Sequence, residues 1–173
     1  MYADKKIVCV SGSLWAGSHN TPWRMLEKDG FQSARWFTTD RQFSGDKYRL
    51  ISLEKFHIDF TNDKILAYMK YGGGFFGINF DDVKNALKSP SVGALIVGFG
   101  FQDIIAQVAN RIPQAIIFTV KNKSMDTSPH LFTADSKGQL HRIDVNVLEL
   151  DAWTKVYNQM LKTLNHSART SRK

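Results

Sequence analysis

The stretch KIVCVSGSLWAGSHNTPWRML, residues 6–26, decides how the fold of this chain is interpreted. Its first apolar run is typical of a strand that is buried on both faces of a parallel sheet. Gly12 and Gly17 then frame a loop, and Thr21 followed by Pro22 predicts the N-cap and first turn of a helix. A strand, a glycine-framed loop and a helix in this order are the layout of a phosphate-binding loop, in which backbone N–H groups face the phosphates.

The rest of the chain alternates between strand and helix patterns, apart from a β-rich stretch with three consecutive glycines near its middle. We therefore predict an α/β fold, with an open parallel sheet flanked by helices, right-handed crossovers and a small β-rich insert at about residues 35–80. The predicted strands after the first are 33–39, 47–52, 64–71, 74–79, 93–99, 114–120 and 140–147, and the predicted helices after the first are 53–60, 80–88, 102–112 and 149–164, with Ser52 and Asn79 as N-caps.

Composition narrows the class of protein. The 173 residues fit a single domain, which we place at 1–165 and follow with a basic, flexible tail at 166–173. No apolar run approaches the roughly 20 residues of a membrane span, so we expect a cytoplasmic protein without a membrane partner. The net charge is +7, but the tail holds three of the basic residues and the others are scattered. Direct binding of nucleic acid is therefore kept only as an alternative.

The sequence contains no pattern typical of a metal site or of a disulfide framework. The only cysteine, Cys9, lies in the first apolar run, where we expect it to pack as a small hydrophobic side chain. The histidines are dispersed and show no metal-ligand spacing. We predict no metal site and no cofactor.

Four segments in this order resemble the guanylate kinase family. The resemblance covers roughly residues 5–165, and it implies the fold of the P-loop nucleoside monophosphate kinases, in which the insert forms the GMP-binding region. The same fold also serves as a non-catalytic binding domain in scaffold proteins. The four segments are VSGSLWAG at 10–17, WFTTDRQFSGDKYRLIS at 36–52, KILAYMKYGGGFFGINFDDVKNAL at 64–87 and IIAQVANRIPQAIIFTV at 104–120.

The resemblance also shows what the phosphate loop lacks. The family pattern places a lysine and then a serine or threonine after the second glycine, for the outer phosphates and for magnesium. Here those two positions are Ser18 and His19, and neither supplies the charge or a good ligand for magnesium. Trp15 stands where the family usually has glycine. The remnant phosphate loop implied by the resemblance consists of Gly12, Ser13, Trp15, Gly17, Ser18 and His19.

The acceptor side departs from the family as well. The acidic residue that reads guanine falls on Ala67, and the hairpin tyrosine falls on Phe76. The family's aspartate after the middle core strand falls on Gly100, close to Asp103. The arginine-rich lid is replaced by residues 121–138, which contain no arginine, so we expect a reduced lid. The remnant acceptor cleft implied by the resemblance consists of Arg35, Thr38, Thr39, Arg41, Tyr48, Phe76 and Asp103.

Phosphoryl transfer depends almost entirely on positioning and on charge stabilisation by lysine, arginine and magnesium. Since these groups are missing together, we predict no catalytic residues and a non-catalytic binding protein, whose partner is a protein or another macromolecule, or a small anionic ligand such as a nucleotide. The first alternative is a nucleoside or deoxynucleoside monophosphate kinase of altered specificity that recruits Lys121 or Lys123. The second alternative is a nucleic-acid-binding protein.

Overall fold

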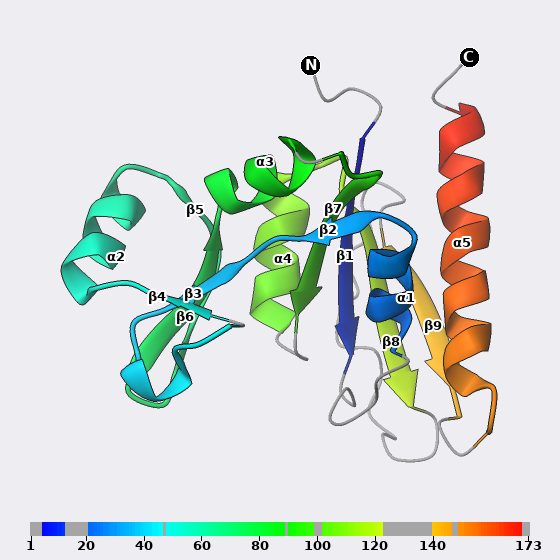
Figure 1. Ribbon diagram of the computed structural model, residues 1–173, viewed down its shortest axis with the longest axis horizontal. Coiled ribbons are helices and arrows are strands. Elements are labelled where there is room, and N and C mark those ends of the chain that lie inside the picture. Colours follow the sequence, from blue (N-terminus) through cyan, green and yellow to red (C-terminus); the bar gives the residue numbers. More distant parts are fainter. Residues whose placement is uncertain are drawn as a thin grey trace.

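The structure is a computed structural model of the 173-residue chain. It describes residues 5–12, 21–46, 48–88, 90–98, 102–122, 140–146 and 149–170, and at 102, 103, 122 and 166–170 it describes the backbone alone. The described strands form two sheets, and helices pack against both of them (Figure 1).

The main sheet has five strands, and all of its neighbouring strands run parallel. The order across the sheet is β2-β7-β1-β8-β9, so β1 is central (Figure 1). Residues Ile7 to Val10 are all buried because helices cover both faces, which explains the continuous apolar run of this strand. The strands are β1 (Lys6–Gly12), β2 (Phe31–Ser33), β7 (Gly93–Gly98), β8 (Ile116–Asn122) and β9 (Leu140–Val145).

Helices cover the main sheet on both sides. Alternate side chains of β1 point to opposite faces, so Cys9 packs with residues of α3 and α4, whereas Val8 packs with residues of α1 and α5. The main sheet is therefore the middle layer of three. The helices are α1 (Pro22–Lys28) and α5 (Ala152–Thr170) on one face, and α3 (Phe80–Lys88) and α4 (Gln102–Arg111) on the other.

The second sheet lies between β2 and α3 along the chain, and its strand order is β4-β3-β6-β5. β3 runs parallel to β4 and antiparallel to β6, while β5 and β6 form a hairpin whose turn includes Gly72 at a φ of 58°. Phe56 of α2 stacks on Phe75 of β6, with ring centroids 4.2 Å apart, so α2 covers one face of this sheet. The elements are β3 (Trp36–Thr38), the 3-10 helix η1 (Arg41–Phe43), β4 (Tyr48–Leu50), α2 (Leu53–Thr61), β5 (Ile65–Tyr71) and β6 (Gly74–Asn79).

One hydrophobic core joins the two sheets. Trp36, Ala67 and Ile78 of the second sheet belong to the same buried cluster as Ile104 and Val108 of α4. Helix α4 therefore packs against the main sheet and also against the inner face of the second sheet, the face opposite α2.

The predicted open parallel sheet flanked by helices is confirmed, and one predicted strand is wrong. The segment 33–39 is not a single strand: Ser33 ends β2 in the main sheet, and Trp36 begins β3 in the second sheet. Ala34 and Arg35 connect β2 of the main sheet to β3 of the second sheet. β2 was not predicted as a separate strand, because three residues are too few to show an alternating pattern.

Two of the three predicted N-caps, Ser52 and Asn79, have different outcomes. The hydroxyl of Ser52 accepts a hydrogen bond from the backbone N–H of Lys55 at 3.0 Å and caps α2 as predicted. At α3 the side chain of Asn79 does not cap the helix as predicted. The carboxylate of Asp82 accepts a hydrogen bond from the backbone N–H of Asn79 at 3.2 Å, while the side-chain amide of Asn79 donates to Asp59.

Candidate functional site

The carboxyl ends of β1 and β7 lie side by side at the topological switch point of the main sheet, where the connections that follow the two strands run to opposite sides. Ser11 and Gly98 are register partners there. The chain leaves β1 through α1 toward β2, whereas it leaves β7 through α4 toward β8 on the other side of β1. Open α/β sheets bind ligands at such a point.

The resemblance predicts a phosphate loop directly after β1, and the structure describes only the first of its predicted residues. Gly12 is the last residue of β1, and α1 begins at Pro22 as predicted. Thr21 takes the N-cap position, although its buried hydroxyl makes no capping hydrogen bond. The predicted loop residues Ser13, Trp15, Gly17, Ser18 and His19 lie outside the described residues, as does most of the predicted lid, residues 123–138.

The residues of the predicted acceptor cleft are largely brought together on the second sheet. Thr38 is the register partner of Phe76, and Tyr48 is the register partner of Trp36 on the neighbouring strand β3. Arg35 directly precedes β3, and Arg41 begins η1. Asp103 does not belong to this sheet, because its backbone lies in the first turn of α4.

Four aromatic rings form a cluster on this sheet, which we call the aromatic face: Phe43, Tyr48, Tyr71 and Phe76. Phe76 lies at its centre, and the rings of Phe43, Tyr48 and Tyr71 meet it edge to face at centroid distances of 5.3, 5.5 and 6.2 Å. Phe76 is buried, whereas Phe43 and Tyr71 leave 43% and 55% of their surface exposed. Burial raises the pKa of the Tyr48 phenol above its ordinary value.

The two threonines of the predicted cleft accept hydrogen bonds from the backbone. The hydroxyl of Thr38 accepts a hydrogen bond from the N–H of Asp40 at 3.0 Å, and that of Thr39 accepts one from the N–H of Phe75 at 2.9 Å. Asp40 in turn accepts a hydrogen bond from the N–H of Gln42, at the start of η1. The Thr39 bond joins the segment before η1 to the hairpin β5–β6, whereas the other two bonds order the start of η1 locally.

The two candidate arginines are exposed. Arg35 donates a hydrogen bond to the carbonyl of Gly45 at 3.3 Å, which orders the loop before β4. Arg41 makes no ion pair with any residue that the structure describes. Its guanidinium is a cation two residues from the exposed ring of Phe43.

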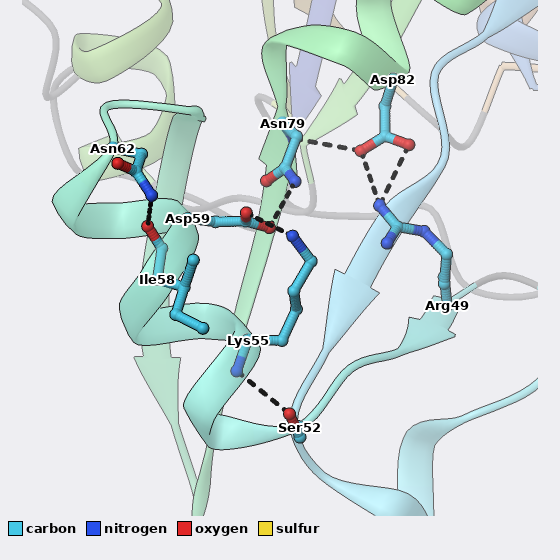
Figure 2. A network of polar contacts seen from close by, with 8 residues as sticks. All are labelled: Arg49, Ser52, Lys55, Ile58, Asp59, Asn62, Asn79 and Asp82. Atoms are coloured by element: carbon cyan, nitrogen blue, oxygen red, sulfur yellow. Dashed lines mark hydrogen bonds and ion pairs between the residues drawn. The ribbon is translucent and has the colours of Figure 1, made fainter.

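A polar network beside the second sheet was not predicted from the sequence. Arg49 of β4 donates to both carboxylate oxygens of Asp82 on α3, at 3.2 and 3.0 Å (Figure 2). The amide of Asn79 donates to the fully buried carboxylate of Asp59 on α2 at 3.2 Å, and Lys55 pairs with the same carboxylate at 2.5 Å (Figure 2).

Of this network, only the i,i+4 spacing of Lys55 and Asp59 was visible in the sequence. The side-chain partners of Arg49 and Asn79 lie 33 and 20 positions away in the chain. Burial raises the pKa of Asp82, and this effect outweighs the opposite effects of the Arg49 guanidinium and the N–H of Asn79.

Among the residues that the structure describes, no group of three or more His, Cys, Asp or Glu side chains could hold a metal ion. No helix in the described part of the chain is long and apolar enough to cross a membrane.

The comparisons with known proteins identify the fold. No protein-family model matches the chain, and no curated protein matches it. The crystal structure of guanylate kinase from Anaplasma phagocytophilum does match, with a TM-score of 0.65 and 12% sequence identity. The match covers 96% of this chain and 87% of that one. The chain therefore has a guanylate-kinase-like fold, as the order of its motifs predicted.

Proposed function

We propose that this chain uses its guanylate-kinase-like fold as a non-catalytic binding protein, whose aromatic face engages a protein partner or a small anionic ligand. The observation that carries the proposal is the exposure of two aromatic rings, Phe43 and Tyr71, on a base formed by Tyr48 and Phe76. Aromatic side chains supply most of the binding energy at many interfaces, because they bury a large area with little loss of conformational freedom.

The groups that would read a nucleotide base are missing from the same sheet. Phe76 has no hydroxyl where the family resemblance implies a tyrosine. Ala67, at the position of the family's acidic residue, is completely buried in the core against α4. Phe76 and Ala67 therefore offer no side-chain hydrogen bond that could select a purine.

Two guanidinium groups near the aromatic face are suited to binding an anionic partner. Arg35 and Arg41 are exposed, and both belong to the segment that leads from β2 through β3 into η1. A guanidinium can form paired hydrogen bonds with a carboxylate or phosphate group. An acidic segment of a protein that also carries an apolar side chain would match both the cations and the rings.

The enzymatic alternative is tested by titration and by a transfer assay. Isothermal titration with ATP, GMP and deoxynucleoside monophosphates, each with and without magnesium, is expected to show no magnesium-dependent binding of ATP. A sensitive assay with labelled ATP is expected to show no transfer to any of these monophosphates. Phosphate transfer that is lost on substitution of Lys121 or Lys123 would overturn the proposal in favour of the altered kinase.

The binding role is tested by affinity capture with paired variants. A partner retained from the native source by the unmodified chain should be lost with the double variant Phe43→Ser/Tyr71→Ser. The control is Ile58→Ser, because Ile58 is a comparably exposed apolar residue of α2, outside the aromatic face. A partner that both variants retain equally would place the interface elsewhere and contradict the proposal.

Nucleic acid is a separate outcome of the same capture experiment. Binding through a basic surface falls steeply as salt rises, because counterions are released from the phosphates. If the captured material is DNA or RNA and shows this salt dependence, the second alternative replaces the proposal.

A further inference from the structure

The second sheet is attached to the rest of the molecule by only two chain connections. One is Ala34–Arg35, between β2 and β3, and the other is the peptide bond between Asn79 and Phe80, where β6 passes into α3. An element held by two such connections can rotate about them as a hinge, unless other contacts oppose the motion. The contacts that bear on such a motion lie at the two outer strands, β5 and β4.

Helix α4 holds the outer strand β5. The side-chain amide of Gln107 accepts a hydrogen bond from the N–H of Tyr68 at 3.0 Å and donates one to the carbonyl of the same residue at 2.9 Å. One turn further along the helix, Arg111 donates to the carbonyl of Ile65 and pairs with Asp63. Both side chains come from the helix that connects β7 to β8, so they belong to the helical layer that covers the main sheet.

Arg111 also reaches the second chain connection. Its guanidinium carbon lies 4.9 Å from the centroid of the Phe80 ring, at the first residue of α3. The N–H of Phe80 donates to the carbonyl of Lys64 at 3.0 Å, just before β5. The start of β5, the start of α3 and the end of α4 are therefore bonded to one another.

Helix α3 holds the opposite outer strand, β4. Arg49 of β4 makes its two hydrogen bonds to Asp82 in the first turn of α3 (Figure 2). Asp82 is only 13% exposed and Arg49 37% exposed, so this pair is better shielded from water than an ordinary surface ion pair. Asn79 and Asp59 extend the same network to α2 (Figure 2).

We infer that α3 and α4 hold the second sheet at both of its outer strands, so that it forms one rigid unit with the main sheet. Gln107 and Arg49 are the positioning residues, one for each strand. A rotation of the second sheet about its two connections would break one of these contacts and would open the shared core at Ala67. The aromatic face is then a preformed surface, whichever partner it binds. This inference is independent of the proposed function, because it concerns the chain without any ligand.

The inference is tested by distance measurements between spin labels. Cys9 is completely buried, so labels attach selectively to introduced cysteines. One pair, Glu54→Cys with Lys162→Cys, joins α2 to α5 and reports on the second sheet. The reference pair, Asn110→Cys with Lys162→Cys, joins α4 to α5 within the main layers. All three positions are exposed.

In the otherwise unmodified chain the two pairs are expected to give distance distributions of equal width. The double variant Gln107→Leu/Arg49→Met should broaden the first distribution and leave the reference pair unchanged. Two changes to the double variant should each narrow the first distribution again. One restores Arg49, and the other uses Arg49→Lys in place of Arg49→Met. Hydrogen exchange adds a local readout: Gln107→Leu should speed exchange of the Tyr68 amide by about tenfold or more, whereas Arg49→Met should leave it unchanged.

Two results would overturn the inference. One is a broader distribution for the second-sheet pair than for the reference pair in the otherwise unmodified chain. The other is an unchanged width of the second-sheet distribution in a folded double variant. Protection of Cys9 from thiol reagents shows that the double variant is folded. If the double variant does not fold, the widths of the two pairs in the unmodified chain still decide the question.

Discussion

Gln107 occupies the outer side of Tyr68 as a neighbouring strand would. Its amide oxygen accepts from the N–H of Tyr68 and its amide nitrogen donates to the carbonyl, at 3.0 and 2.9 Å. The outer strand of a sheet leaves such groups free to pair with another chain, and native proteins cover them. Here a helix side chain provides the cover, and it also joins the two sheets.

Replacing Gln107 by leucine should lower the free energy of unfolding by about 1–3 kcal/mol, because the backbone groups of Tyr68 lose their partners in a partly buried site. Denaturation by guanidinium chloride measures the change. The control is Asn110→Ala, an exposed substitution on the same helix. Equal stability of the two variants would show that the hydrogen bonds of Gln107 contribute nothing.

Gly93 and Gly73 should respond in opposite ways to alanine. A Cβ atom at Gly93 would lie 2.3 Å from the carbonyl oxygen of Lys6 on the neighbouring strand, and backbone cannot move aside cheaply. We expect Gly93→Ala to lower the free energy of unfolding by about 3 kcal/mol, the upper end of the usual cost of overpacking. At Gly73 a Cβ atom would meet nothing within 4 Å, so Gly73→Ala should change stability by about 0.5 kcal/mol or less. Thermal unfolding of the two variants compares them directly.

Cys9 should be inert in the folded protein. Complete burial in the central strand raises the pKa of its thiol to about 12 and shields it from reagents. A chromogenic disulfide reagent at pH 8 is expected to react with less than about a tenth of the chains in buffer and with all of them in denaturant. Rapid reaction in buffer would contradict the burial of β1.

The stability of the fold should fall at high pH because of Tyr157. Burial, and then its hydrogen bond to the carboxylate of Asp29, raise the pKa of this phenol from 10.0 to about 12. The unfolded chain therefore loses the proton at lower pH than the folded chain. The favourable contribution is complete below pH 10 and is lost as pH rises from there toward 12.

Absorbance at 295 nm measures this titration. The difference between the unmodified chain and Tyr157→Phe isolates one tyrosine, which should ionise well above pH 10. The same substitution should make the denaturation midpoint less dependent on pH between 10 and 12. If the missing tyrosine titrates at its ordinary value, the bond between α5 and Asp29 is not formed in solution.

Much of the architecture could be predicted because it depends on residues that are close together in the sequence. The apolar run at Ile7–Val10, the Ser52 cap and the glycine turn between β5 and β6 are short-range signals, and each was recognised. The short strand β2 and the reversed roles of Asn79 and Asp82 were not recognised, since both depend on what lies opposite them in the fold. Of the acceptor-side positions that the resemblance indicated, Thr38, Tyr48 and Phe76 lie in strands of the second sheet, whereas Asp103 lies in α4.

The sequence by itself determined the α/β alternation, the order of motifs and the replacement of the phosphate-loop lysine and hydroxyl by Ser18 and His19. These follow from residue type and spacing, which act over a few neighbouring residues. Only the tertiary structure decided that three rings gather around Phe76 and that two helices hold the second sheet by its outer strands. Arg49 and Asp82 are 33 residues apart and Tyr68 and Gln107 are 39 residues apart, and no local pattern encodes such pairs.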